Sequence, residues 1–594
     1  MSFHPNDVQR RGRTATFILA GAFTFLGSAF FRTQILEHAA YTLQSETNRL
    51  REVPLPAPRG IIYDRHGAII AENLPGYSVS ILAKTSESLR AALKQLSGVI
   101  NFSPEQIEAA VRRFRQAPNR PTVILADASF DVVSVLEEHR VDYPGLIIQA
   151  APKRYYPDKE AVASFVGYTS EITESELKER QYRNYKSGQE IGKAGLERQY
   201  EAQLRGKEGT HFVEVDARGR VVGEAGGRGD ITPESPDPLY TNIDLDLQRF
   251  AATLFGDSLQ GGVMAMDPKT GEVLAIHSAP SFDPNKFIGG VSTQYYSQLR
   301  DDPRRPLYNK VIQGLYPPGS TFKLATAIMG MEAGIGLDDH MPTPCTGGYF
   351  YGNRYFRCWD KKGHGDVNLR QAIEKSCDVY FYQLGLRIGI QNMLAGGVSL
   401  RMREKSGIDL PNEKTPLWPF AKEYFDRKYG TSGWSQGVLL SLSIGQGENS
   451  QTVANMARFY TALATDGSMV RPEIVRRQTE RTKIINLTPE QMEGLQRAMA
   501  GVVSSRGTAA GAQIQGVVIA GKTGTAQSGH FRNGVELNHA WFTGYAPAED
   551  PKIVIAVMLE DVAFHGSVAA QIASKMIEHY LKRPTIQGAQ LEGD

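Results

Sequence analysis

The chain has 594 residues, of which 41% are hydrophobic and 22% charged, and its net charge is +2. It exceeds the roughly 150 residues of one typical domain, and its composition is that of a globular protein. Because the two signs of charge are balanced and interspersed, the sequence lacks the basic footprint of a nucleic-acid-binding protein, and we expect no nucleic acid as a partner.

The first predicted element is an uncharged apolar run at residues 14–31. Its length is close to the minimum that spans a bilayer as a helix. Arg10, Arg11 and Arg13 precede it, so the positive-inside rule predicts a cytoplasmic tail at 1–13 and the rest of the chain outside. A cleaved signal peptide and a twin-arginine export signal are the alternatives. The run is long for a signal core and no clear cleavage site follows, and a bare arginine pair is a weak export motif.

Residues 32–237 are predicted to form a non-catalytic domain. Residues 61–73 read as two short strands around a glycine turn. Residues 86–140 look helical, with a capping box that begins at Ser103. Glycine, proline, arginine and aspartate dominate 205–237, so we place the domain boundary near 237.

The second domain is predicted at 238–582, with a C-terminal tail at 583–594. "GGVMAMDPKTGEVLAIHSA" reads as strand, turn and strand, and "VVIAGKTGTAQ", "HAWFTGYAP" and "KIVIAVMLED" read as three more strands before a last helix. A long helical stretch, about 310–510, separates the two groups. Strands from both ends of a domain with helices between them predict an antiparallel sheet covered by helices, hence an α+β fold.

A serine and a lysine stand three residues apart in "YPPGSTFKLATAIMG". Ser320 is predicted to begin a helix that is apolar on nearly all sides and therefore buried. Positions i and i+3 share a helix face, so we expect the Lys323 amine beside the Ser320 hydroxyl. A buried lysine with a lowered pKa is a suitable base for a serine nucleophile. Alone, this motif is weak, and a plain N-cap serine with a surface lysine is the alternative.

The second candidate motif is Ser376-Cys377-Asp378, in the helix-like segment "RQAIEKSCDVYFYQLG". Ser376 is placed to relay a proton to a leaving amine. Asp378 is the third residue of the motif and completes its polar pair.

The third motif is "GKTGTA", on a predicted strand far downstream. Lys522 offers a positive charge to a substrate carboxylate, and Thr523 offers a hydroxyl donor. Gly524 lets a peptide backbone approach closely, and the Thr525 N–H completes an oxyanion hole. This motif alone is at chance level, but three motifs in this order and spacing are a strong signal.

The order SxxK, SxN-like, KTG resembles that of the penicillin-recognising serine acyltransferases. Most of residues 50–560 resembles the class B, monofunctional penicillin-binding proteins. Matching segments include "RGIIYDRHG", "RYYP", "GKAGLERQYEAQLRGKEG", "IDLDLQ", "VMAMDPKTGEVLA", "SIGQGENSQTVANMARFYTALATDG" and "HAWFTGYAP". One departure is Asp378, which stands where most of the superfamily has asparagine; some relatives of this branch share the aspartate.

The resemblance implies an N-terminal transmembrane helix, an elongated non-catalytic pedestal (a dimerisation-type domain) and a penicillin-binding transpeptidase domain. It implies a peptidoglycan D,D-transpeptidase of the cell-elongation branch, with an acyl-enzyme at Ser320 and with β-lactams as inhibitors. The implied partners are D-Ala-D-Ala stem peptides and a multispanning membrane glycan polymerase. The implied location is the inner membrane, with one span and the catalytic domain in the periplasm. No cofactor is expected for catalysis.

Three other functions share the motifs. One is a division-specific transpeptidase. A serine β-lactamase is another, but it needs a water-activating carboxylate near Ser320, which we cannot identify, and it needs no large pedestal. The third is a β-lactam sensor, which needs several spans or a cytoplasmic effector, whereas this sequence predicts one span.

All three cysteines fall between 345 and 377, with a histidine among them. Cys345, Cys358, His364 and Cys377 make a complete tetrahedral zinc set, although their spacing is not that of a standard finger. The resemblance adds that some relatives carry a metal at positions matching the last two. The alternative is a Cys345–Cys358 disulfide with a free third thiol. Asp360 and Asp366 are spare oxygen ligands.

Overall fold

The computed structural model of the chain describes residues 5–38, 50–118, 120–215, 221–224, 229–563 and 566–582. Its first element is α1 (Pro5–Phe31), which continues into a π-helical turn (Arg32–Leu36). Together they contain an apolar helix, Gln9–Leu36, whose most apolar window is entirely unburied. At about 1.5 Å per residue this helix is long enough to cross a bilayer, and it includes the predicted span 14–31. The predicted tail at 583–594 lies outside the described residues.

Two sheets form the framework of the pedestal. One has the strand order β10-β2-β3-β4, with β5 also pairing with β3, and the other has the order β1-β8-β9. Their strands are β1 (Leu50–Leu55), β2 (Ile62–Tyr63), β3 (Ile69–Ile81), β4 (Thr122–Ala128), β5 (Leu146–Tyr155), β8 (Gly209–Val215), β9 (Val221–Glu224) and β10 (Leu239–Tyr240). The hairpin predicted at 61–73 is confirmed as β2 and β3, which meet at a turn containing Gly67 with φ +85°. β3 runs well beyond the predicted segment.

Short helices and a small ribbon complete the pedestal. They are α3 (Ser86–Leu96), α4 (Pro104–Gln116), α5 (Phe130–Glu138), α6 (Ala163–Val166), α7 (Gly195–Gln199), α8 (Glu201–Leu204), β6 (Thr169–Glu171) and β7 (Glu190–Gly192). The capping box is confirmed, because Ser103 Oγ accepts from the Gln106 N–H and Gln106 Oε1 accepts from the Ser103 N–H. The prediction of helix throughout 86–140 is wrong at β4, "TVILADA". A short apolar run cannot be told from a buried helix by periodicity, and here pairing with β3 decides its conformation.

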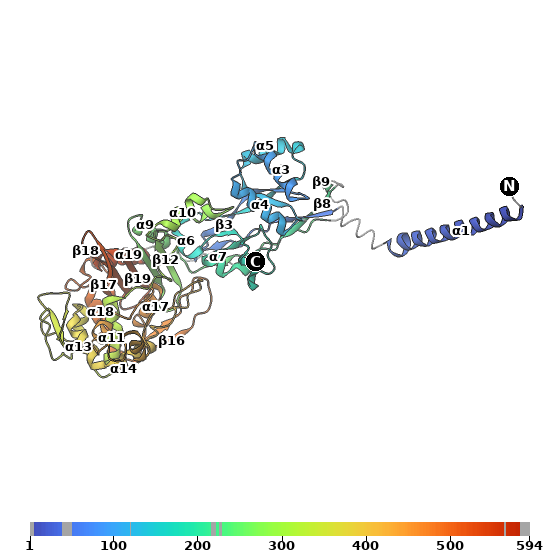
Figure 1. Cartoon of the computed structure of the whole chain (residues 1–594). Coiled ribbons are helices and arrows are strands. Elements are labelled where there is room, and N and C mark those ends of the chain that lie inside the picture. Colours follow the sequence, from blue (N-terminus) through green and yellow to red (C-terminus); the bar gives the residue numbers. More distant parts are fainter. Residues whose placement is uncertain are drawn as a thin grey trace, which may run out of the picture.

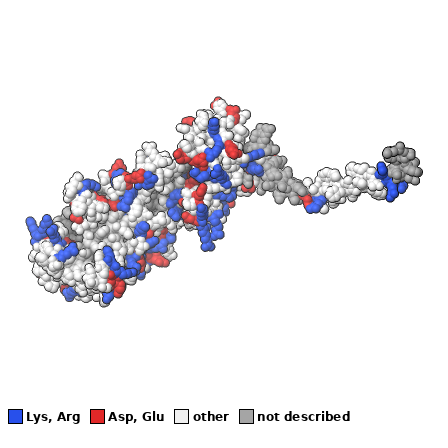
Figure 2. Space-filling model, in the orientation of Figure 1, with Lys and Arg blue, Asp and Glu red and all other residues white. Residues whose placement is uncertain are grey.

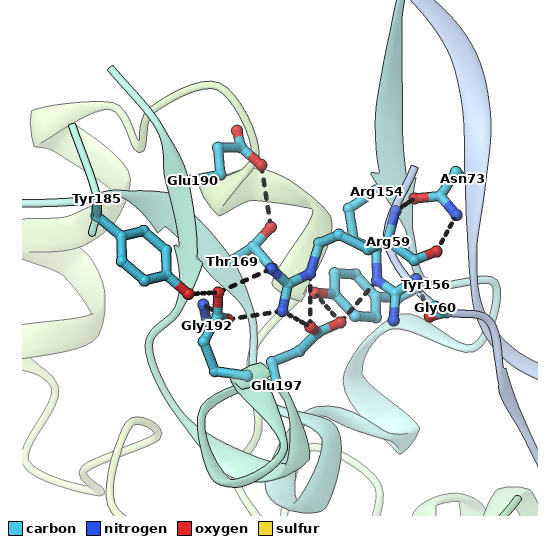
Figure 3. Close-up of polar contacts among 11 residues, drawn as sticks. Arg59, Gly60, Asn73, Arg154, Tyr156, Thr169, Tyr185, Glu190, Gly192 and Glu197 are labelled. Atoms are coloured by element: carbon cyan, nitrogen blue, oxygen red, sulfur yellow. Dashed lines mark hydrogen bonds and ion pairs between the residues drawn. The ribbon is translucent and has the colours of Figure 1, made fainter. Parts of the chain in front are cut away.

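A buried charge cluster ties the pedestal segments together (Figure 3). Glu197 on α7 accepts from Arg154 on β5 at 2.6 Å and from Arg59 at 2.7 Å. Arg59 also reaches Glu201 at 2.8 Å. Burial is the largest influence on Glu197 and raises its pKa, but Arg154 and Arg59 together outweigh it, so the pKa lies below its usual value. Two cations therefore face two carboxylates, and the cluster is balanced.

The second domain is built on one antiparallel sheet of order β12-β11-β19-β18-β17. Its strands are β11 (Gly261–Met266), β12 (Val273–Ala279), β17 (Ala520–Arg532), β18 (Val535–Ala546) and β19 (Ile553–Val562). The five predicted strands are confirmed. Two of them come from the start of the domain and three from its end, so the sheet closes by pairing β11 with β19, and β17 is left at one edge.

Helices cover the sheet and fill the space between its two strand groups. They are α9 (Leu245–Phe255), α10 (Thr293–Asp301), α11 (Lys323–Glu332), α12 (Leu369–Glu374), α13 (Asp378–Ile388), α14 (Ile390–Ser399), α15 (Glu423–Tyr429), α16 (Val438–Ser443), α17 (Val453–Leu463), α18 (Pro489–Val503) and α19 (Ser567–Leu581). All side chains from Ile553 to Leu559 are buried, so both faces of β19 are covered. Two small ribbons, β13–β14 (Gly348–Tyr351 and Arg354–Arg357) and β15–β16 (Ser468–Val470 and Arg481–Lys483), extend from this core.

The pedestal and the second domain share a continuous interface (Figure 1). β10 follows the predicted boundary near 237 and so belongs to the second domain by sequence, but it pairs in parallel with β2 of the pedestal. One hydrophobic core cluster includes residues of both domains, such as Ile62 and Val263. Tyr200 of the pedestal donates to Asp409 of the second domain at 2.7 Å. On the face drawn in Figure 2, acidic and basic side chains are interspersed over both parts. The described part of the chain therefore has an α+β fold in which the pedestal is packed against the domain that carries the motifs.

Candidate active site

Ser320 lies in a tight turn pressed against the edge strand. It belongs to a 3₁₀ turn, Gly319–Phe322, that leads directly into α11. Gly319 has φ +53°, and a Cβ there would lie 2.9 Å from the Thr525 carbonyl oxygen, so only glycine fits between the turn and β17. A Cβ at Gly524 would lie 2.8 Å from the Pro318 carbonyl oxygen. The glycines of both motifs thus bring the serine turn and the strand into contact.

Lys323 is fully buried, and its amine holds the second motif. Lys323 Nζ lies 2.7 Å from Asp378 Oδ1, 2.8 Å from the Ser376 carbonyl oxygen and 3.1 Å from Ser376 Oγ. In the described part of the chain, the Lys323 amine makes no hydrogen bond to Ser320. The structure thus brings Lys323, Ser376 and Asp378 together, and Ser320 stands at the start of the same helix.

Ser376 adopts a conformation that the sequence did not predict. The predicted helical segment breaks between α12 and α13, and Ser376 in the break has φ +55°. Such a left-handed conformation is unfavourable for serine and persists only where its surroundings hold it. Here Lys323 binds both its carbonyl and its hydroxyl oxygen, and the Trp359 indole N–H also donates to its carbonyl at 3.1 Å.

Both carboxylate oxygens of Asp378 have partners inside the protein. Oδ1 accepts from Lys323, and Oδ2 accepts from the Trp359 backbone N–H at 3.0 Å. Burial is the largest influence and raises the pKa of Asp378 above its usual value, although the charge of Lys323 opposes the shift. Asp378 therefore orients the lysine and the Trp359 segment.

The "KTG" segment lies on β17, the edge strand of the sheet. Lys522 is fully buried, and burial, followed by repulsion from Lys323, lowers its pKa well below the usual value. Its amine donates to the Thr523 carbonyl at 3.2 Å, and no carboxylate lies within ion-pair distance among the described residues. The Thr523 hydroxyl contacts that of Thr508 at 2.7 Å, and Thr525 Oγ1 accepts from the Gly566 N–H at 3.4 Å. An anionic group placed at Lys522 would supply the missing partner.

The four predicted metal ligands converge. One ligand atom from each of Cys345, Cys358, His364 and Cys377 lies within 4.8 Å of all the others. The structure holds the three cysteines as free thiols, so the alternative disulfide is absent. His364 Nδ1 lies 3.6 Å from Cys345 Sγ and 3.5 Å from Cys358 Sγ. A tetrahedral zinc with Zn–S of about 2.3 Å and Zn–N of about 2.0 Å needs an S···N separation of about 3.6 Å. The donor set fits zinc.

The cluster also favours a thiolate. A hydrogen bond from Cys377 is the largest influence and, with one from His364, lowers the pKa of Cys358 well below its usual value, although burial opposes the shift. Cys377 is buried and its thiol faces this cluster, whereas Ser376 and Asp378 on either side of it contact Lys323. One short segment therefore serves two sites.

Several contributors to the site carried no motif of their own. Trp359 touches both Ser376 and Asp378, Thr508 contacts Thr523, and a Cβ at Gly445 would lie 2.2 Å from the Gly319 carbonyl oxygen. Trp359 directly follows Cys358, so its place in the cysteine-rich segment was the available signal. Nothing in the sequence near Thr508 distinguishes it.

Comparisons with known proteins agree with this fold and site. Residues 261–578 match the family described as "Penicillin binding protein transpeptidase domain", and residues 54–235 match "Penicillin-binding Protein dimerisation domain". "Peptidoglycan D,D-transpeptidase MrdA" of Acinetobacter baumannii is 35% identical over 94% of this chain and 85% of the relative. The protein of the same name from Haemophilus influenzae is 32% identical over 93% of this chain and 88% of the relative.

Two solved structures are similar over nearly the whole chain. The structure described as "Complex between Penicillin-Binding Protein (PBP2) and MreC from Helicobacter pylori" has a TM-score of 0.78 and 28% identity, and covers 90% of this chain and 99% of that one. The structure described as "Structural coordination of polymerization and crosslinking by a peptidoglycan synthase complex" has a TM-score of 0.70 and 29% identity, and the match covers 97% of this chain and 99% of that one.

A dimerisation-type pedestal joined to a penicillin-binding transpeptidase domain defines the class B penicillin-binding proteins, and the chain belongs to this family. The relatives and the Helicobacter pylori structure named above are of the penicillin-binding protein 2 (MrdA) type.

Proposed function

We propose that this chain is a peptidoglycan D,D-transpeptidase that crosslinks stem peptides during cell elongation and is a target of β-lactams. Relatives at 35% and 32% identity bear the name "Peptidoglycan D,D-transpeptidase MrdA". The observation that carries the proposal is the contact of Lys323 with Ser376 and Asp378, one helical turn from Ser320 and beside an unpaired cation at Lys522.

The donor peptide adds to the edge of the sheet. β17 has a neighbour on one side only, so an extended stem peptide can pair with its free edge. Its terminal D-Ala carboxylate then meets the Lys522 ammonium, and Thr523 offers its hydroxyl. This alignment places the penultimate D-Ala carbonyl carbon at Ser320 Oγ, and the N–H groups of Ser320 and Thr525 receive the oxyanion.

The proton route passes through Lys323. The Ser376 carbonyl and the Asp378 carboxylate only accept hydrogen bonds, whereas Ser376 Oγ can donate or accept. Two N–H groups of the amine therefore donate to the Ser376 carbonyl and to Asp378. The third position on its nitrogen faces the Ser376 hydroxyl, 3.1 Å away, and can exchange a proton with it. Lys323 takes the proton of Ser320 as the acyl bond forms, relayed through the Ser376 hydroxyl, and the same hydroxyl then returns a proton from Lys323 to the departing D-Ala amine. An amine of a neighbouring stem peptide then attacks the acyl-enzyme and releases Ser320.

The decisive experiment supplies the full-length chain with polymerised, lipid-linked glycan that carries stem peptides. The expected result is D-Ala release matched by crosslinked products, both lost in Ser320→Ala. Rapid hydrolysis of β-lactams without crosslinking would instead indicate a β-lactamase. Depletion in the source cell separates the two cellular roles, because loss of rod shape is expected for elongation and filamentation for division.

The cysteine–histidine cluster is proposed to hold a structural zinc through Cys345, Cys358, His364 and Cys377. When bound, the ion would crosslink the β13–β14 segment to the turn that carries Ser376. One zinc per purified chain with three thiols after denaturation is expected; no metal and one thiol would overturn the assignment. Cys377→Ser should lower the penicillin acylation rate and the thermal midpoint together.

The proposed location is the inner membrane, with residues 14–31 of α1 as the single span and residues 1–13 in the cytoplasm. The pedestal (32–237) and transpeptidase domain (238–582) would lie in the periplasm. The arginines before the apolar run support this orientation. A multispanning glycan polymerase is the proposed partner, because the chain resembles a component of a peptidoglycan synthase complex. Co-purification of the full chain with its polymerase, lost when α1 is replaced by an unrelated span, would support it.

A further inference from the structure

The ribbon β13–β14 displays an aromatic face to solvent. Phe350 is 71% exposed and Tyr355 is 44% exposed. They are cross-strand neighbours, and their ring centroids lie 4.7 Å apart. Contiguous exposed aromatic side chains, unlike single ones, are typical of interaction surfaces.

The architecture of the ribbon makes this face flat and firm. A Cβ at Gly348 would lie 2.3 Å from the ring of Tyr355, so the ring lies across the bare glycine backbone. The opposite face carries Tyr349 and Phe356, which pack against the core of the domain. The Tyr382 hydroxyl on α13 donates to the Arg357 carbonyl at 2.9 Å. The contacts of the inner face thus stabilise the ribbon, and the outer aromatic rings are available to bind a partner.

The same face continues toward Ser376 of the candidate active site. Positions 355, 357 and 359 alternate outward, and Trp359 is 59% exposed. Its indole N–H donates to the carbonyls of Lys375 and Ser376, at 3.0 and 3.1 Å, so the exposed ring is held still. The aromatic face therefore ends one hydrogen bond away from Ser376.

The segment is also basic. Residues 348–363 contain one acid and four basic side chains, all four exposed, which are Arg354, Arg357, Lys361 and Lys362. None of the four lies within ion-pair distance of a carboxylate among the described residues. Arg354 lies on the inner face with Phe356, whose ring centroid is 5.0 Å from its guanidinium carbon, so Arg357, Lys361 and Lys362 are the cations available to the outer face. Flat rings with unpaired cations around them suit a ligand that has apolar faces and carboxylates.

A glycan strand with stem peptides has this chemistry, because its sugar rings present C–H faces and its peptides carry carboxylates. A bilayer surface also attracts aromatic and basic side chains, but the position of the ribbon argues against it. The ribbon packs on α13, and Figure 1 places α13 at the end of the molecule opposite β8, the partner of β1, with which the pedestal begins.

We propose that Phe350, Tyr355 and Trp359 form a platform for the acceptor glycan strand, with Arg357, Lys361 and Lys362 binding its stem-peptide carboxylates. This rests on the proposed transpeptidase function and extends it to acceptor recognition. The platform holds the neighbouring strand beside the acyl-enzyme, so that its amine is delivered to the Ser320 ester on the side of Ser376.

Binding tests the platform without relying on catalysis. The full-length chain in nanodiscs is sedimented with purified peptidoglycan and, separately, with glycan strands stripped of peptides. The double variant Phe350→Ala/Tyr355→Ala is expected to bind both at least about tenfold more weakly, while its thermal midpoint and its rate of penicillin acylation stay at wild-type values. The matched control is Phe130→Ala in the pedestal, since Phe130 is 68% exposed and pairs with Tyr77 at 6.5 Å. It should bind as the wild type does.

A second double variant separates the two kinds of contact. Arg357→Gln/Lys361→Gln should weaken binding to peptide-bearing peptidoglycan and leave binding to stripped strands unchanged. Equal glycan binding by the wild type and by Phe350→Ala/Tyr355→Ala would overturn the proposal. It would also be overturned if this variant lost binding to anionic vesicles but kept its binding to glycan. If the wild-type chain binds glycan through this face but releases no D-Ala, the transpeptidase function is refuted, whereas the proposed glycan platform is not.

Discussion

The pedestal and the transpeptidase domain each bury a cluster of charges, and the two clusters are balanced differently. In the pedestal, two arginines face two glutamates, and the pKa of Glu197 stays below its usual value despite complete burial. At the candidate active site, Lys323 and Lys522 are both buried, and Asp378 is the only carboxylate within ion-pair distance of either among the described residues. The balanced cluster stabilises the fold. The unbalanced cluster has an excess of positive charge that can bind a negatively charged group of the substrate.

The largest effect is expected from breaking the balanced cluster. Glu197→Gln leaves Arg154 buried without a carboxylate, and removing one partner of a buried ion pair costs about 3–5 kcal/mol. Chemical denaturation of the periplasmic part should show this loss of unfolding free energy. Glu108→Gln, which breaks an exposed pair with Arg90, is the control and should leave stability unchanged. A stable Glu197→Gln protein would show that the cluster does not hold the pedestal.

The opposite result is expected at Lys522. Lys522→Met removes an unpaired buried cation without changing the volume much, so we expect it to stabilise the folded chain by about 1 kcal/mol. The same change removes the partner of the β-lactam carboxylate and should slow penicillin acylation by about 10²-fold. Thermal melts and acylation kinetics on one sample measure both. A loss of stability would mean that Lys522 has a partner in the resting protein.

Lys522 also predicts a pH dependence. Its pKa is lowered in the folded chain, so its contribution to stability is present above pH 10.5 and is lost as the pH falls toward the folded value. The stability advantage of Lys522→Met should therefore grow as the pH falls. Penicillin acylation by the wild type, which needs the ammonium, should decline as the pH rises through a value below 10.5. An acylation rate that stays flat up to pH 10.5 would contradict the shift.

A smaller effect on acylation is expected at Asp378. Asp378→Asn introduces the residue that most of the superfamily carries. The carboxylate now accepts one hydrogen bond from Lys323 and one from the Trp359 N–H, whereas the amide has one oxygen and can accept only one of them in this arrangement. We expect a loss of about 1–2 kcal/mol in stability and less than a tenfold change in the acylation rate. Complete loss of acylation would indicate that the negative charge itself is needed to keep Lys323 in place.

The catalytic motifs were predictable from sequence because each is local. Ser320 and Lys323 lie on one helical turn, and Lys522 to Thr525 lie along one strand, so spacing alone indicates which residues act together. The cysteine–histidine set was found by its composition. Its four ligands do converge, although the metal itself stays a proposal.

The remaining features depend on contacts between distant segments. The break at Ser376 exists because Lys323 and Trp359 bind its carbonyl, which no helical pattern reveals. β4 was read as helix because only its pairing with β3 separates the two conformations. The pedestal cluster joins Arg59 and Arg154 to Glu197 across the domain, and no local pattern connects them.

The most direct test of the account is to locate the covalent adduct formed by the full-length chain with a labelled penicillin. Peptide mapping by mass spectrometry should find one equivalent on Ser320, stable for many minutes, with none in Ser320→Ala and a strongly reduced amount in Lys323→Ala. An adduct on Ser376, or rapid loss of the label with release of hydrolysed penicillin, would contradict the assignment of Ser320 as the acylated residue of a transpeptidase.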